Sequence, residues 1–171
     1  VSMVARLTLG KKKYADVEEE MKTVLDKAEA LREALSALVE SDAVAFQRVM
    51  GAYRLSKEDD GRVNAIQKAT IGAIQVPLTV ADKAVQVMVL ALRAAEIGNL
   101  NAISDAGVGV NLAHAAVLGG LYNVRINLRG LTDEEIKEDF LSEAKALKNE
   151  AVSLKSELEE ILVNRGGFLA L

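Results

Sequence analysis

Apolar or small side chains recur every three or four residues along one unbroken stretch of this chain, from Tyr14 to Tyr53. That spacing puts them on one face of a helix, and the stretch contains no Pro and only one Gly, Gly51. At 1.5 Å per residue, such a helix is about 60 Å long. Because a helix of that length needs a long partner, we expect an elongated bundle in which two copies pack side by side.

The rest of the chain is also helical in its pattern. Residues 55–61 are mostly charged and end in Gly61, which predicts a loop, and Pro77 predicts a helix start or a kink. Ser104 is a candidate N-cap, with Asp105 in the first turn of the helix that follows. Thr132-Asp-Glu-Glu135 forms a capping box ahead of a last helix, which the glycines at 166–167 end. We therefore expect further helices over about 62–75, 78–97, 104–127 and 132–161.

No segment shows the alternating apolar pattern of a β-strand. Half of the residues are hydrophobic but only 4% are aromatic, as in a helical core built from alanine and leucine. The length of 171 residues fits one domain. The expected fold class is all-α, with residues 1–171 as a single helical domain: an elongated bundle of about five helices, two of them long, that packs as a dimer.

Residue counts narrow the chemistry. The chain has no Cys and one His, which excludes thiol nucleophiles and disulfides and makes a metal site improbable. An enzyme built from these residues works with carboxylates, Lys, Tyr and amides. A net charge of −4 disfavours broad contact with nucleic-acid phosphates. The lack of Cys is compatible with a cytoplasmic location, which we expect.

Nineteen uncharged residues separate Asp105 from Arg125, which is long enough to cross a bilayer. Asn111, His114 and Asn123 interrupt this stretch, and four glycines lower its hydrophobicity. We therefore expect a helix buried on all sides within the domain and no membrane partner. A lone His on such a helix is more often a hydrogen-bonded core residue than a catalytic base.

Asp42 interrupts the apolar face of the first long helix, one step of four after Leu38. A buried Asp is costly unless it is paired, and burial raises the pKa of a carboxyl group toward the range useful for proton transfer. Asp42 is therefore a candidate acid or base. The alternative, equally weighted, is that it faces solvent at the edge of the bundle or caps a neighbouring helix.

Asp105, Asn123 and Asn127 share one face of the helix predicted over 104–127. Asp105 and Asn123 are 18 residues apart, which is about 27 Å along a helix axis. One copy cannot use both in a small site, but an antiparallel twofold dimer places Asp105 of one copy beside Asn123 of the other. The alternative is a cap for Asp105 and ordinary interhelical amide hydrogen bonds for the asparagines. On the residues alone, this alternative is favoured.

Five segments together are similar to the cyclodeaminase/cyclohydrolase family, whose members include formiminotetrahydrofolate cyclodeaminase and methenyltetrahydrofolate cyclohydrolase. The segments are Met3–Tyr14, Asp42–Phe46, Ala52–Lys57, Asn101–Gly109 and Asn123–Leu128. Family members carry a Gly-rich segment ahead of the position of Met3, whereas this sequence begins at Val1. Where the family has Leu-Pro-Lys, this chain has Leu55-Ser-Lys57 and keeps the Lys.

The resemblance implies an all-α homodimer that closes 5-formiminotetrahydrofolate to 5,10-methenyltetrahydrofolate and releases ammonia. This reaction moves protons and needs general acid–base groups rather than a metal. The expected partners are the folate substrate, a second copy of the chain and, as a candidate, a formiminotransferase. The implied catalytic residues are Asp105, Asp42 and Lys57. The candidate substrate-binding residues are Asn101, Ser104, Asn123, Asn127, Tyr53 and Arg6. From their charge alone, Arg6 and the nearby lysines are candidates to attract the glutamate tail of the folate.

Three other functions stay open on the sequence. A methenyltetrahydrofolate cyclohydrolase would use the same ligand and the same acid–base residues, with water in place of the internal amine. A folate-binding helical protein without turnover belongs to a different class. An interaction module of paired long helices is the third.

Overall fold

Five α-helices and two short 3₁₀-helices make up the described chain, residues 1–169 of a computed structural model, and no strand occurs in that range. The elements in chain order are α1 (Ser2–Thr8), η1 (Lys12–Val17), α2 (Glu18–Tyr53), α3 (Arg62–Ile97), η2 (Leu100–Ala102), α4 (Ile103–Leu128) and α5 (Glu134–Asn164). The all-α class and the elongated shape are confirmed. Four of the helices are long, with 36, 36, 26 and 31 residues, where the sequence predicted two.

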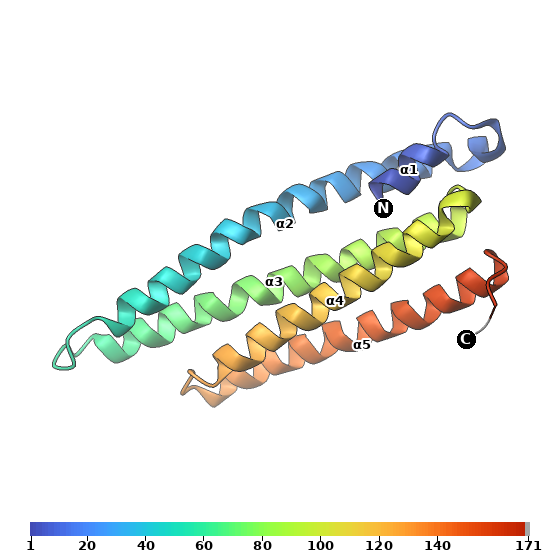
Figure 1. The fold of residues 1–171 in the computed structure, drawn as a ribbon. Helices are drawn as coiled ribbons and strands as arrows, with labels where there is room; N and C mark the ends of the chain where they lie inside the picture. Colours follow the sequence, from blue (N-terminus) through green and yellow to red (C-terminus); the bar gives the residue numbers. More distant parts are fainter. Residues whose placement is uncertain (170–171) are drawn as a thin grey trace.

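Helix α3 lies at the centre, because α2, α4 and α5 all pack against it (Figure 1). The loop between α4 and α5 is hydrogen-bonded to Gln67 of α3. Gln67 Nε2 donates to the carbonyl of Gly130 at 2.9 Å, and Gln67 Oε1 accepts from the amide of Thr132 at 2.8 Å. Beyond this point the hairpin of α2 and α3 extends past the end of α4 and α5 (Figure 1). The hairpin therefore presents a surface that α4 and α5 do not cover.

The first long helix begins at Glu18, not at the predicted Tyr14. Tyr14 lies in η1 with non-helical backbone angles, and its hydroxyl accepts a hydrogen bond from the amide of Leu100 at 2.9 Å. The aromatic residue at the start of the apolar pattern therefore ties η1 to the turn between α3 and α4. Tyr14 has the spacing of a residue on the apolar face of the helix, but it lies before the helix begins.

Helix α3 continues through Pro77, which corrects the expectation of two helices separated there. A Pro inside a helix removes the hydrogen bond from its own nitrogen to the carbonyl four residues earlier, here that of Ala73. Asn127 of α4 replaces it, since its Nδ2 donates to the Ala73 carbonyl oxygen at 2.9 Å. A donor from a neighbouring helix thus keeps the backbone of α3 satisfied.

The predicted cap at Ser104 is wrong. Helix α4 begins at Ile103 after the short η2, and it is Asn99 whose side chain accepts from the amide of Asn101 at 3.1 Å. Asp105 does lie in the first turn of α4, as expected. At the start of α5 the cap is Asp133, whose carboxylate accepts from two backbone amides.

Helix α4 is buried on one face, not on all sides as its uncharged sequence predicted. The inner face packs on α3 and α5, while four large side chains of the outer face are between 55 and 68% exposed: Val108, Leu112, Tyr122 and Ile126. By length and composition, α3 is the one helix within residues 1–169 that could cross a membrane. In the fold, α3 is the central helix of the bundle.

Candidate functional site

A groove of about 350 Å³ opens between α2, α3 and α4. Its two polar lining residues are Asp42 on α2 and Asn123 on α4, and the sequence singled out both. The other lining residues are apolar or glycine: Leu35, Leu38, Val39, Pro77, Val80 and Gly120. Two residues that are 81 positions apart in sequence therefore line one cavity, which we call the Asp42 groove.

Asp42 is exposed, which agrees with the solvent-facing position that the sequence left open beside burial in an apolar seam. Within residues 1–169 the carboxylate has neither a hydrogen bond nor an ion pair. Asn123 donates from Nδ2 to the carbonyl of Gly119 at 3.1 Å, on its own helix. The Asp42 carboxylate is thus available to a ligand in the groove.

A close approach between α3 and α4 forms the floor of this groove. A Cβ atom added to Gly120 would lie 2.7 Å from the carbonyl oxygen of Pro77 and 3.3 Å from the Cβ of Ala81. Real Cβ atoms do not come that near a backbone oxygen, so position 120 requires glycine in this packing. The absent side chain brings Asn123, one turn further along α4, close to the α2–α3 pair.

Asn101, Ser104 and Asp105 form a second cluster at the opposite end of α4, and all three are exposed. Asp105 is separated from Asn123 by 18 residues of continuous helix, about 27 Å. One copy of the chain therefore does not bring Asp105 to the Asp42 groove. The face of α4 between the two clusters carries the exposed apolar side chains described above.

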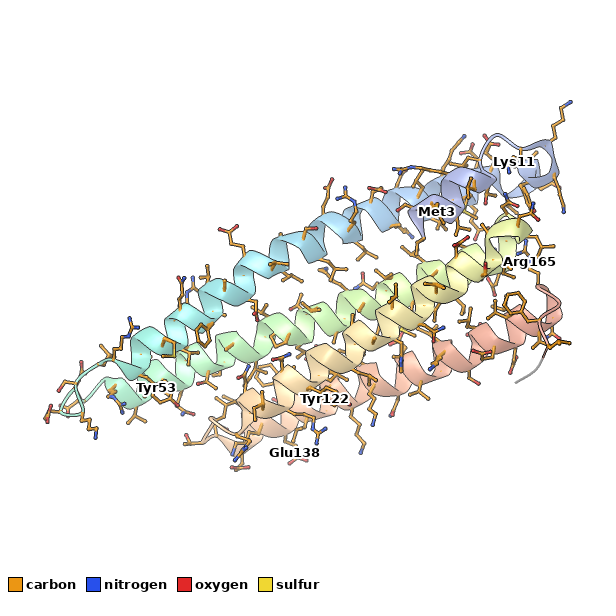
Figure 2. All side chains as sticks on the ribbon, in the orientation of Figure 1. Met3, Lys11, Tyr53, Tyr122, Glu138 and Arg165 are labelled. Carbon is orange, nitrogen blue, oxygen red and sulfur yellow. The ribbon has the colours of Figure 1, made fainter. Side chains whose placement is uncertain are left out.

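Tyr53 lies at the far tip of the α2–α3 hairpin (Figure 2). Lys57 lies in the loop between α2 and α3, and both residues are exposed. Tyr53 is eleven residues beyond Asp42 on α2, about 16 Å along the axis. Its ring lies 6.0 Å from the guanidinium of Arg62, which also donates to the Tyr53 carbonyl oxygen. Within one copy, neither residue lines the Asp42 groove.

Arg6 and Asn127 have partners inside the fold. The exposed Arg6 forms an ion pair with Glu29 of α2 at 3.2 Å, which joins α1 to α2. Asn127 makes the interhelical hydrogen bond to Ala73 already described. That contact is the amide role that the sequence offered as the alternative to substrate binding.

His114, the one histidine, is half-buried on α4. Burial and, to a smaller degree, the charge of Lys155 lower its pKa from the usual value of 6.5. Among residues 1–169, no group of three or more His, Cys, Asp or Glu side chains is arranged to hold a metal ion.

Sequence reasoning missed a second groove, of about 460 Å³, between α4 and α5. Its cationic residues are Arg125, Lys145 and Lys148, and no carboxylate lines it. The sequence does contain one sign of these unpaired cations. Lys145 and Lys148 have no acidic residue three or four positions away, on a helix that is otherwise rich in Glu.

Long antiparallel helices with an aspartate and an asparagine in one open groove define an all-α protein with the groups for acid–base chemistry. Comparison with known proteins identifies its family. The family model described as formiminotransferase-cyclodeaminase matches residues 1–146. The chain belongs to this family.

Two relatives and one solved structure illustrate its range. A methenyltetrahydrofolate cyclohydrolase of Methylorubrum extorquens is 43% identical, over 96% of this chain and 81% of the relative. The formimidoyltransferase-cyclodeaminase of Rattus norvegicus is 32% identical over 88% of this chain, which spans 28% of that longer protein. The crystal structure of formiminotetrahydrofolate cyclodeaminase from Thermotoga maritima has a TM-score of 0.88 and 30% identity, covering 96% of this chain and 80% of that one.

Proposed function

We propose that the protein cyclises 5-formiminotetrahydrofolate to 5,10-methenyltetrahydrofolate with release of ammonia. The observation that carries this proposal is the Asp42 groove, which holds an unpaired carboxylate beside an amide in a chain of this family. The name of the structurally similar Thermotoga maritima enzyme supports the reaction.

The reaction needs two proton transfers. The N10 nitrogen of the folate attacks the formimino carbon and loses a proton, and the departing nitrogen gains a proton and leaves as ammonia. One carboxylate accepts and one carboxylic acid donates, which we assign to Asp42 and Asp105. General acid–base groups of this kind typically contribute 10² to 10⁴ in rate each. Asn123 and Asn101 hydrogen-bond the pterin and the formimino group in this proposal.

Because Asp105 lies about 27 Å from Asn123 in one copy, the proposed site is complete only in a homodimer. The exposed apolar face of α4 is the surface expected of such a contact. An antiparallel pairing of two α4 helices buries this face and brings Asp105 of the partner toward Asn123 and Asp42. The proposed site is thus composite, with one aspartate from each copy.

Within this dimer we assign further roles to Lys57, Tyr53, Ser104 and Arg6. Lys57 and Tyr53 lie at the hairpin tip, where they contact a second copy in this proposal. Lys57 holds or polarises the substrate. Ser104 and Arg6 contribute to substrate binding. A formiminotransferase is a candidate partner, because animal relatives that this chain matches over 28% of their length carry that activity in their names. We place the protein in the cytoplasm.

A second candidate reaction is hydrolysis of methenyltetrahydrofolate. The 43% identity to the cyclohydrolase of Methylorubrum extorquens over nearly the whole chain favours it specifically. Water then takes the place of the internal amine, and the same two aspartates move the protons. The two reactions differ in substrate and not in the residues required.

Both reactions are tested by following the absorbance of methenyltetrahydrofolate, which rises in cyclodeamination and falls in hydrolysis. We expect Asp42→Asn and Asp105→Asn each to lower kcat by about 10² to 10⁴. Asp26→Asn, an exposed aspartate on the same helix as Asp42, is the matched control and should retain wild-type turnover. Near-native turnover of the folded Asp42 and Asp105 variants would show that the carboxylate mechanism is wrong.

A further inference from the structure

The groove between α4 and α5 combines an apolar floor with a cationic edge. The floor consists of Leu118, Leu121, Leu141 and Ala144, and the ring of Tyr122 stands beside it. Arg125, Lys145 and Lys148 supply three positive charges. Lys145 and Lys148 are one turn apart on α5, about 4.5 Å along the axis. This cationic groove has the lining of a site for a ligand with an aromatic body and more than one carboxylate.

These three charges have no partner within the described chain. None of the ion pairs among residues 1–169 involves Arg125, Lys145 or Lys148, although other cations of the chain, such as Lys22, Arg93 and Lys137, do form such pairs. No acidic residue lies three or four positions from any of the three, which is the spacing at which helical ion pairs form. A cluster of three uncompensated cations is unexpected in a chain of net charge −4.

The cationic groove and the Asp42 groove flank the same turn of α4. Tyr122 lines the first and Asn123, the next residue, lines the second. A helix with its side chains is about 10–12 Å across, so one extended ligand can reach both sides. Gly119, one turn before Asn123, faces open space, because a Cβ there would meet no atom within 4 Å.

In the proposed dimer this turn lies at the end of the contact between the two α4 helices. A twofold axis that exchanges Asp105 with Asn123 passes nearest to position 114, midway between them. Tyr122 is eight residues from that point, about 12 Å along the helix, near the end of the contact. A ligand held between Asn123 of one copy and Asp105 of the other can therefore extend over the turn.

We propose that the cationic groove binds the aminobenzoyl-glutamate half of the folate substrate, an inference that rests on the proposed function. The benzoyl ring packs on the apolar floor beside Tyr122, and the glutamate carboxylates pair with Arg125, Lys145 and Lys148 rather than with Arg6, which forms an ion pair with Glu29. The pterin end and the one-carbon unit remain on the side of Asp42 and Asn123. The groove is thus a positioning site that holds the non-reacting half of the substrate.

Binding is tested without turnover by titrating the full chain with p-aminobenzoyl-glutamate and observing the protein by NMR. We expect Lys145→Gln/Lys148→Gln to weaken this binding at least tenfold, and Lys27→Gln, an exposed lysine on α2, to leave it unchanged. The uncharged diamide of the same compound should bind at least tenfold more weakly than the dicarboxylate. Equal binding by the double variant, or by the diamide, would overturn the proposal.

Kinetics then separate a substrate subsite from an independent anion site. We expect Lys145→Gln/Lys148→Gln to raise the KM of the folate substrate at least tenfold and to leave kcat within about twofold, because the lost contacts are made equally in ground and transition states. An unchanged KM with turnover intact would contradict the groove assignment alone. Fragment binding at the groove without turnover of either folate would contradict the proposed function and leave the groove as an anion site.

Discussion

Asn127 of α4 supplies the hydrogen bond that Pro77 removes from α3. Its Nδ2 donates at 2.9 Å to the carbonyl of Ala73, the group that the missing N–H of position 77 would otherwise satisfy. The floor of the Asp42 groove includes Pro77 and lies between these same two helices. A helix-breaking residue is thus tolerated at the site because the neighbouring helix compensates for it.

The first prediction concerns this pair. Asn127→Ala leaves the Ala73 carbonyl without a donor and should lower the free energy of unfolding by about 1–3 kcal/mol in denaturant titrations. In a Pro77→Ala background, alanine restores the helical N–H, so the same Asn127→Ala change should cost at least about 1 kcal/mol less. An equal cost in both backgrounds would mean that Asn127 stabilises the fold in some other way.

The second prediction uses two adjacent glycines as an internal comparison. Gly120→Ala places a Cβ 2.7 Å from the carbonyl oxygen of Pro77 and should destabilise the fold by about 1–3 kcal/mol. Gly119→Ala meets nothing within 4 Å and should be neutral or stabilise α4 by up to about 1 kcal/mol. Thermal unfolding of both variants measures the difference. If both variants had the same stability, the close approach of α3 and α4 would be disproved.

The third prediction concerns pH. Burial, with a smaller effect from Lys155, lowers the pKa of His114 in the folded chain, so below about pH 6.5 the unfolded chain takes up a proton that the folded chain resists. The contribution of His114 to the free energy of unfolding is therefore fully present above about pH 6.5 and is lost as the pH falls below that value. His114→Gln should reduce that decrease in stability in denaturant titrations, by less than about 1.4 kcal/mol. A decrease of the same size in variant and wild type would contradict this.

Much of the fold was predictable, because long three-four patterns specify helices and their ends carry loop residues. Pro77 misled the prediction, since a sequence pattern does not show that an amide from α4 lies beside Ala73. The start of the first helix was misplaced because Tyr14 continues the apolar spacing while serving a tertiary contact with Leu100. In both cases a long-range hydrogen bond overrode a local signal.

The site was predictable only in part. Asp42 and Asn123 were singled out separately, and the structure places both in one groove. Burial of Asp42 was one of two alternatives, and its exposed position matches the other. The burial expected for all of α4 was wrong, because an apolar pattern does not reveal whether a surface faces the core of one copy or another copy. Arg125, Lys145 and Lys148 were missed because isolated surface cations are common, and their shared groove requires two helices to be aligned.

Mixing two inactive variants tests the composite site most directly. Asp42→Asn and Asp105→Asn chains are each expected to lose turnover, but a mixed dimer retains one site with Asp42 from one copy and Asp105 from the other. After the two variants are unfolded and refolded together, about half of the dimers are mixed, each with one of two sites intact. The mixture should then recover about a quarter of the wild-type turnover. No recovery above the single variants, in a sample shown to contain mixed dimers, would contradict a site built from both copies.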